Sequence, residues 1–122
     1  IRSKTDFDNA LWNLVAEKYK EAGGKSISFG KPHKPIYDLA ISKLRNINSS
    51  IKKSDIVCVG DGISTDILGG ISYGLDTLFV AGGLSARDTG ISSHSSSPDQ
   101  EKLKNFLNKK ELQPTATIGY FQ

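Results

Sequence analysis

The sequence has few of the residues that disulfides, zinc sites and membrane-spanning helices require. It contains one cysteine and two histidines among 122 residues. A single thiol excludes a disulfide within the chain, and these three side chains are too few for a structural zinc site. No apolar run approaches the roughly 20 residues of a membrane-spanning helix. We therefore expect a cytoplasmic protein that does not bind membranes.

Two nucleotide-binding motifs are absent as well. The glycine pairs at 69–70 and 82–83 do not form the dinucleotide-binding fingerprint, and no glycine-rich loop ends in Gly-Lys-Ser or Gly-Lys-Thr. The formal net charge is only +3 and the lysines are dispersed, which argues against a nucleic-acid partner. With 37% hydrophobic and 24% charged residues, the chain is expected to fold around a single core.

What is present is an alternation of helical and strand patterns. Apolar residues at helical spacing predict helices over 9–22, 36–47 and 65–74. A serine followed by proline and acid predicts a further helix start at Ser97. Short apolar runs predict strands over 26–30, 56–59, 77–81 and 115–119, the last near a sheet edge. The run at 56–59 is continuous, as in a central parallel strand covered on both faces, so the order of elements predicts a parallel α/β sheet.

The turn after the 56–59 strand carries the residues best suited to chemistry. Asp61 follows the strand directly, at the carboxyl end where open α/β sheets place ligands, and Gly60 and Gly62 let the backbone turn sharply and approach a ligand closely, which makes them candidate phosphate-binding residues. Asp66 lies one helical turn on and can swing back toward Asp61. Two carboxylates in one small volume repel unless a cation neutralises them, and Mg²⁺ prefers such oxygen ligands. The loop therefore predicts a magnesium site.

Each candidate residue also has an ordinary structural use. Asp61 can be a turn residue and Asp66 a helix-capping acid. Lys31 follows a predicted strand and can present its ammonium to a phosphoryl group at the same sheet edge, but it can equally be a solvated loop lysine. His33 is interpreted as polar surface, and Cys58 as a small buried hydrophobe. The apolar strand before Asp61 and the helical acid after it favour the metal.

Four motifs follow one another in a specific order. Gly30-Lys31-Pro32 precedes a helix, the carboxylate loop runs from Gly60 to Asp66, and two further glycine-containing stretches follow at 74–77 and 80–83. In this order they closely resemble the haloacid-dehalogenase-like (HAD) phosphatase superfamily. The resemblance is to the branch with an α/β cap, which includes NagD-like and p-nitrophenyl-phosphatase-like enzymes, and it is strong over residues 23–84.

The resemblance implies a three-layer, Rossmann-like α/β core with a parallel sheet, a Mg²⁺ cofactor and an aspartyl-phosphate intermediate. It assigns Lys31 to steadying the nucleophile and the phosphoryl group. It makes Asp61 a magnesium ligand, and it gives Asp66 the role of supporting the metal through water or hydrogen bonds. It also implies that residues 1–24 are the C-terminal end of the cap and residues 25–122 the C-terminal half of the core.

Two motifs of that family have no counterpart in this sequence, the one that holds the nucleophile and the later one that holds a serine or threonine. The nucleophile belongs to an Asp-x-Asp-Gly motif after the first core strand, whereas Asp6-Phe7-Asp8 is followed by Asn9 and by a predicted helix. We therefore expect an incomplete core that lacks the first strand and most of the cap, and a chain that is a portion of a longer enzyme. Without the attacking carboxylate, the chain alone is expected to be inactive.

The sequence thus predicts the C-terminal part of a Mg²⁺-dependent phosphomonoester hydrolase that acts on a small phosphorylated metabolite. The alternative is a non-catalytic α/β binding module that retains the acidic loop. A flavodoxin- or receiver-like domain shares the order of strand and acid but does not explain Lys31-Pro32. A sheet without its first strand would also expose edges and apolar faces, which favour a homo-oligomer through sheet or cap surfaces.

Overall fold

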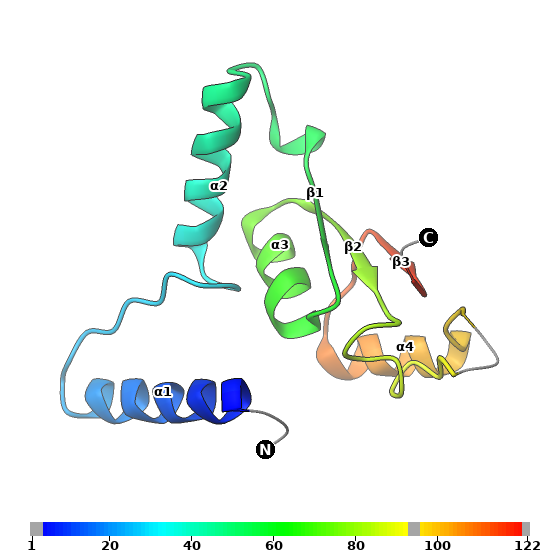
Figure 1. The fold of residues 1–122 in the computed structure, drawn as a ribbon, viewed down its shortest axis with the longest axis horizontal. Coiled ribbons are helices and arrows are strands. Elements are labelled where there is room, and N and C mark those ends of the chain that lie inside the picture. The colour runs from blue at the N-terminus through cyan, green and yellow to red at the C-terminus, as the bar shows by residue number, and fades with distance from the viewer. Residues whose placement is uncertain (1–3, 93–95, 121–122) are drawn as a thin grey trace.

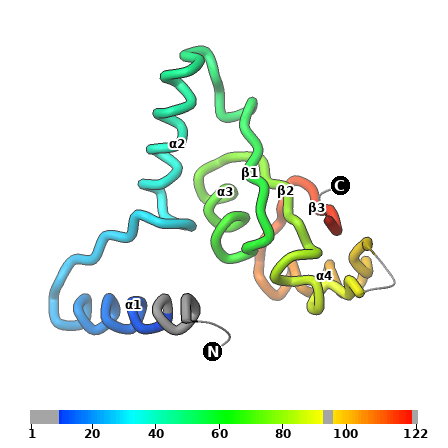
Figure 2. Tube along the Cα trace, viewed as in Figure 1, coloured from blue at the N-terminus to red at the C-terminus, as the bar shows by residue number. Residues whose placement is uncertain are grey.

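The computed structural model of the chain describes residues 4–92 and 96–120. Helices occupy most of the first half of the chain, and a small sheet with flanking helices forms the second half (Figures 1 and 2). The short η1 is a 3-10 helix and η2 is a π-helix. The elements in chain order are α1 (Lys4–Glu21), α2 (Lys34–Ile47), η1 (Lys53–Asp55), β1 (Val57–Gly60), η2 (Ile63–Ile67), α3 (Leu68–Tyr73), β2 (Asp76–Val80), α4 (Gln100–Lys110) and β3 (Ala116–Ile118).

The sheet consists of three parallel strands in the order β1-β2-β3. Val59 of β1 is opposite Leu78 of β2, and Phe79 of β2 is opposite Thr117 of β3. Because the strands are parallel, their carboxyl ends lie at one edge, where the turn after β1 and the loop after β2 meet. The predicted parallel α/β arrangement is confirmed, with three of the four predicted strands and with β3 at an edge.

One face of the sheet carries the core. Thr77 and Phe79 of β2 are buried, and Phe79 stacks on Phe106 of α4 with ring centroids 6.1 Å apart. On the same face, a Cβ at Gly70 of α3 would lie 2.7 Å from Cγ2 of Thr77 and 3.0 Å from Cβ of Cys58. Since side chains alternate along a strand, α3 and α4 both pack on the side of these residues.

The opposite face of β1 is largely open. Val57 is 54% exposed and Val59 is 44% exposed. The prediction that this strand is covered on both faces is therefore wrong for the described residues, because the two helices nearest to the sheet share one side. Of the three expected layers, the described residues supply the sheet and the helices on this one face.

Residues 26–30 do not form the predicted strand. They run between α1 and α2 (Figure 1). The side chains of Ile27 and Phe29 are exposed. A strand is stable only when a neighbour pairs with its backbone, and the described residues place no strand beside this segment. The alternation of apolar and polar residues was thus correct as a pattern but not sufficient for a strand.

The helices agree more closely with the sequence. The predicted helices over 9–22 and 36–47 correspond to α1 and α2, and the one over 65–74 to η2 and α3. The start of α4 differs: the N-cap is Asp99, whose carboxylate accepts a hydrogen bond from the Lys102 backbone N–H at 2.9 Å. Aspartate is as good a cap as the expected Ser97, and it lies directly before the first apolar turn.

Helix α1 lies apart from the sheet (Figure 1). Its large apolar side chains are exposed, including Leu11, Trp12 and Tyr19. The division of the chain into a cap remnant over 1–24 and a core from 25 onward stays a prediction. No described helix combines the length and the apolar character that crossing a bilayer requires.

Gly74 ends α3 in the left-handed conformation, with φ of 81°. A Cβ there would meet only Nζ of Lys53, 3.9 Å away, so a larger residue would be strained by its backbone and not by crowding. We expect Gly74→Ala to lower the free energy of unfolding, measured by urea denaturation, by about 1 kcal/mol. The control is Gly30→Ala, which meets nothing within 4 Å and has no left-handed φ. Equal losses in the two variants would contradict this explanation.

Candidate functional site

The site predicted from the sequence lies at the carboxyl end of β1. The strand ends at Gly60, and Gly62 is the N-cap residue of η2, so only Asp61 separates the strand from the helical turn. In η2 the backbone N–H of Ile67 donates to the carbonyl of Gly62 at 3.1 Å, five residues back. This wide turn brings Asp66 back over the end of the strand.

Asp66 is in direct contact with Lys31. The Lys31 ammonium donates to Oδ1 of Asp66, and the Gly62 backbone N–H donates to Oδ2 at 3.1 Å. The Asp66 side chain is only 15% exposed, whereas that of Lys31 is 53% exposed. The structure therefore brings together two predicted site residues that are 35 positions apart, and it leaves the ammonium accessible to solvent.

The glycines on either side of Asp61 make room for this contact. A Cβ at Gly60 would lie 2.4 Å from Cγ of Asp66, and one at Gly62 would lie 2.9 Å from Oδ2 of Asp66 and 2.1 Å from Oγ1 of Thr65. A side chain at either position would push the Asp66 carboxylate away from Lys31. Both glycines thus have a structural role that the sequence did not reveal, and their predicted contact with phosphate stays a prediction.

Asp61 is held by the loop that follows β2. Its Oδ2 accepts a hydrogen bond from the Leu84 backbone N–H at 3.1 Å, and a Cβ at Gly83 would lie 2.2 Å from the same oxygen. Gly83 is therefore required for the close approach of this loop. The side chain of Leu84 is 76% exposed at the same sheet edge. Sequence reasoning missed this contact, although the glycine pair after a buried strand was a signal of close backbone approach.

At the end of β1, the described residues offer a magnesium ion one free carboxylate oxygen, on Asp61. Within residues 4–92 and 96–120, no group of three or more histidine, cysteine, aspartate or glutamate side chains is gathered to hold a metal. Mg²⁺ needs only one or two carboxylates, since waters and substrate phosphate complete its octahedron. Both oxygens of Asp66 already accept hydrogen bonds, whereas Oδ1 of Asp61 has no donor among the described residues. Asp61 is thus the residue that could bind a metal directly.

Two other candidates have ordinary surroundings. His33 is exposed at the N-cap of α2 and makes no side-chain capping hydrogen bond. Cys58 lies within β1 against α3, and burial raises the pKa of its thiol above the ordinary value. A raised pKa disfavours the reactive thiolate, so Cys58 is unsuited to act as a nucleophile.

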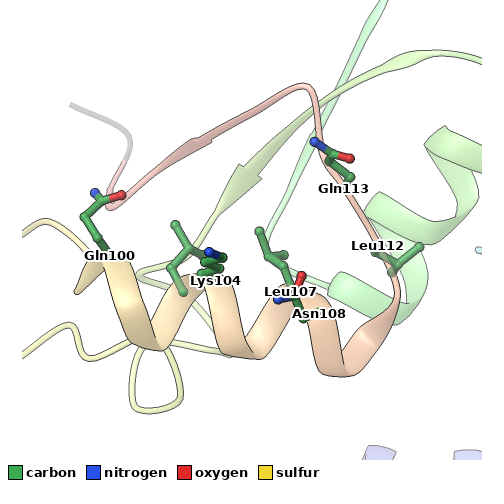
Figure 3. A pocket seen from close by; sticks show the side chains of 7 residues that line it. Gln100, Lys104, Leu107, Asn108, Leu112 and Gln113 are labelled. Carbon is green, nitrogen blue, oxygen red and sulfur yellow. The ribbon is translucent and has the colours of Figure 1, made fainter.

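A separate hollow of about 370 Å³ lies along α4. Figure 3 shows Gln100, Lys104 and Leu107 on the helix, with Leu112 and Gln113 on the segment that follows it. No acid lines this hollow, and it shares no residue with the turn around Asp61. It is therefore not an extension of the carboxylate site.

Comparison with known proteins is consistent with this geometry. A protein-family model described as HAD-hydrolase-like matches residues 28–106. An acid sugar phosphatase of Staphylococcus haemolyticus is 36% identical over 86 residues, covering 70% of this chain and 24% of that protein. The ribonucleotide monophosphatase NagD of Escherichia coli K12 is 36% identical over 82 residues, covering 67% of this chain and 31% of that protein. The chain thus spans about a quarter to a third of the length of these relatives.

Solved structures give the same result. A haloacid dehalogenase-like hydrolase from Brucella suis superposes with a TM-score of 0.59 at 32% identity, covering 89% of this chain and 36% of that one. A possible sugar phosphatase of the HAD superfamily from Cytophaga hutchinsonii gives 0.60 at 26% identity, covering 90% and 34%. The arrangement of strands and helices around the carboxylate turn is therefore similar to part of these larger chains.

Proposed function

Because the chain belongs to the HAD-like hydrolase family, in its NagD-like phosphatase branch, we propose that it forms the C-terminal part of a Mg²⁺-dependent phosphomonoester hydrolase. The observation that carries this proposal is the contact of Lys31 with Asp66 beside Asp61, at the carboxyl end of β1. The arrangement sets one cation and one available carboxylate oxygen at the sheet edge where such folds bind ligands.

Lys31 is the residue proposed to meet the transferring phosphoryl group. Its ammonium is held at one side by the nearly buried carboxylate of Asp66, and it is half-exposed on the other. A fixed cation of this kind stabilises charge on phosphoryl oxygens without having to reorganise during the reaction. Asp66 is proposed to orient Lys31 and the turn, because both of its oxygens are already engaged.

Asp61 is the proposed metal ligand, through Oδ1, while its Oδ2 stays bonded to the Leu84 backbone N–H. When bound, Mg²⁺ would neutralise charge on a substrate phosphate oxygen. The fixed orientation of the Asp61 carboxylate lowers the cost of assembling such a site, since only one carboxylate oxygen remains to be directed at the ligand.

The attacking group is proposed to be an aspartate outside this chain. Its carboxylate oxygen would bond to phosphorus as the phosphoester P–O bond breaks, and the departing oxygen would take up a proton. Water would then hydrolyse the aspartyl-phosphate. Relatives of the chain are named acid sugar phosphatase and ribonucleotide monophosphatase, so we propose a phosphomonoester of a small metabolite as the substrate.

The proposal is tested by measuring hydrolysis of p-nitrophenyl phosphate by the full-length protein that contains this chain. Activity is expected to rise and saturate with Mg²⁺ and to be lost in EDTA. Equal activity in EDTA would show that the reaction does not need Mg²⁺. If neither this compound nor other small phosphomonoesters were hydrolysed, the proposal that the protein is a phosphatase would be refuted.

The second candidate is a non-catalytic binding module that retains the acidic loop. It is favoured by one observation: among the described residues both carboxylate oxygens of Asp66 already accept hydrogen bonds, so that of the two acids only Asp61 offers a free oxygen to a metal. Saturable binding of a phosphorylated metabolite without turnover in the same experiment would support it. Turnover that depends on Mg²⁺ would exclude it.

A further inference from the structure

Tyr37 connects the segment that carries Lys31 with the turn that carries Asp66. It lies in the first turns of α2, only three positions after the start of that helix at Lys34. We propose that Tyr37 is a positioning residue for the Lys31–Asp66 pair, acting through the backbone of η2 and through Gly69. This inference rests on the proposed function, because positioning matters only if the pair meets a substrate.

The side chain of Tyr37 packs against two residues of α3, Tyr73 and Gly69. It is one of the two buried residues of α2, and it stacks on Tyr73 with ring centroids 5.4 Å apart and planes inclined by 25°. Its hydroxyl reaches Gly69, where a Cβ would lie only 2.0 Å from the hydroxyl oxygen and 2.6 Å from Cζ. Only glycine allows this approach, so the ring fits into a notch in the backbone of α3.

The hydroxyl also faces two carbonyl groups of η2. It donates to the carbonyl of Thr65 at 3.4 Å and to that of Asp66 at 3.5 Å. These hydrogen bonds are long, so the hydroxyl is shared between the two acceptors instead of being fixed on one. Burial raises the pKa of the Tyr37 hydroxyl above its ordinary value, so it stays protonated and able to donate at neutral pH.

Asp66 is consequently contacted twice by one short segment. Lys31 binds its carboxylate and Tyr37 binds its carbonyl, and only six positions separate the two residues. The placement of α2 against η2 therefore sets where the ammonium of Lys31 lies. Tyr37 itself contacts backbone and not the accessible side of Lys31, which is why its role is positioning and not catalysis.

Tyr37→Phe tests the hydroxyl while keeping the ring. In the full-length protein we expect kcat for p-nitrophenyl phosphate to fall about fivefold with KM unchanged, the effect of losing a weak, partly buried hydrogen bond. The amide shift of Gly62, which donates to Asp66, is expected to move in ¹⁵N-glycine spectra. The matched control is Tyr73→Phe, because the Tyr73 hydroxyl donates to Asp38 at 2.6 Å and not to η2. That variant should change neither quantity.

Gly69→Ala tests the notch. The added methyl group would displace the Tyr37 ring, and we expect kcat to fall about a hundredfold, as for a misplaced catalytic group. Combining it with Tyr37→Leu, which removes the clashing atoms, should cost no more than the larger of the two single changes. Losses that multiply in the double variant would show that Gly69 and Tyr37 act independently, against the proposal.

The outcomes separate this inference from the proposed function. If Tyr37→Phe and Gly69→Ala lower only the melting temperature, with kcat and the Gly62 shift unchanged, Tyr37 is a packing residue and the inference is wrong. If the unchanged protein hydrolyses no phosphomonoester, the proposed function fails. The Gly62 shift in Tyr37→Phe, compared with Tyr73→Phe, then still decides whether Tyr37 positions Asp66.

Discussion

Asp61→Asn is expected to lower kcat/KM for phosphomonoester hydrolysis by the full-length protein by at least about a hundredfold, since a metal contributes several kcal/mol to such reactions. Asparagine keeps the shape of the side chain, and its amide oxygen can still accept from Leu84, but the negative charge that attracts Mg²⁺ is gone. The measurement is initial rate against Mg²⁺ concentration, in which the variant should need far more metal for half-maximal activity.

A matched change at another aspartate controls for net charge. Asp88 is exposed in the loop after β2, so Asp88→Asn removes one negative charge without touching the carboxylate turn. Its kcat/KM and its Mg²⁺ dependence are expected to equal those of the unchanged protein. The assignment of Asp61 as the metal ligand would be refuted if the two variants behaved alike.

Lys31→Met is expected to lower kcat by roughly 10²–10³-fold, because it removes a fixed positive charge while preserving an unbranched side chain. The loss should not arise from unfolding. The lysine side of the pair is half-exposed, and Asp66 keeps its hydrogen bond from the Gly62 backbone N–H, so we expect the loss to cost about 1 kcal/mol of folding free energy. Activity and urea denaturation of the same preparation separate the two effects.

Lys34→Met supplies the comparison for that variant. Lys34 pairs with Asp38 at 2.7 Å within α2, with both side chains well exposed. The change therefore removes a lysine and an ion pair three positions from Lys31 but outside the site. We expect kcat to be unaffected. A comparable loss of activity in both variants would mean that general surface charge matters and not the position of Lys31.

Local signals predicted most of the elements of this fold. The apolar spacing of α2 and the runs of β1 and β2 each lie within one short window, so the pattern was sufficient. The predicted strand at Ile27 and Phe29 was wrong because a strand needs a neighbouring strand to pair with, and no local pattern can supply one. The prediction that Val57 is buried was wrong for a similar reason, since tertiary contacts decide on which side of the sheet α3 and α4 pack.

The site was predictable as a set of residues but not as a set of contacts. Asp61, Asp66 and Lys31 were found from the turn after a strand and from the motif order. The contact of Lys31 with Asp66 joins residues far apart in sequence, and the glycine pair before Leu84 indicated a close backbone approach without naming Asp61 as the partner. Tyr37 was not singled out, although it lies within the predicted helix over 36–47. The glycine at 69, inside a predicted helix, was the available hint that another group packs closely there.

The π-helical turn η2 has a consequence for how this protein can vary over evolution. Each residue of an α-helix turns the chain by about 100°, so loss or gain of one residue between Asp66 and Gly69, where η2 continues into α3, would rotate these two residues relative to each other by roughly that angle. Asp66 would then leave Lys31, or Gly69 would leave Tyr37. Some substitutions in this stretch can be absorbed by neighbouring side chains, whereas a one-residue insertion or deletion between Asp66 and Gly69 would break one of these two contacts. The number of residues in the turn is therefore constrained independently of their identity.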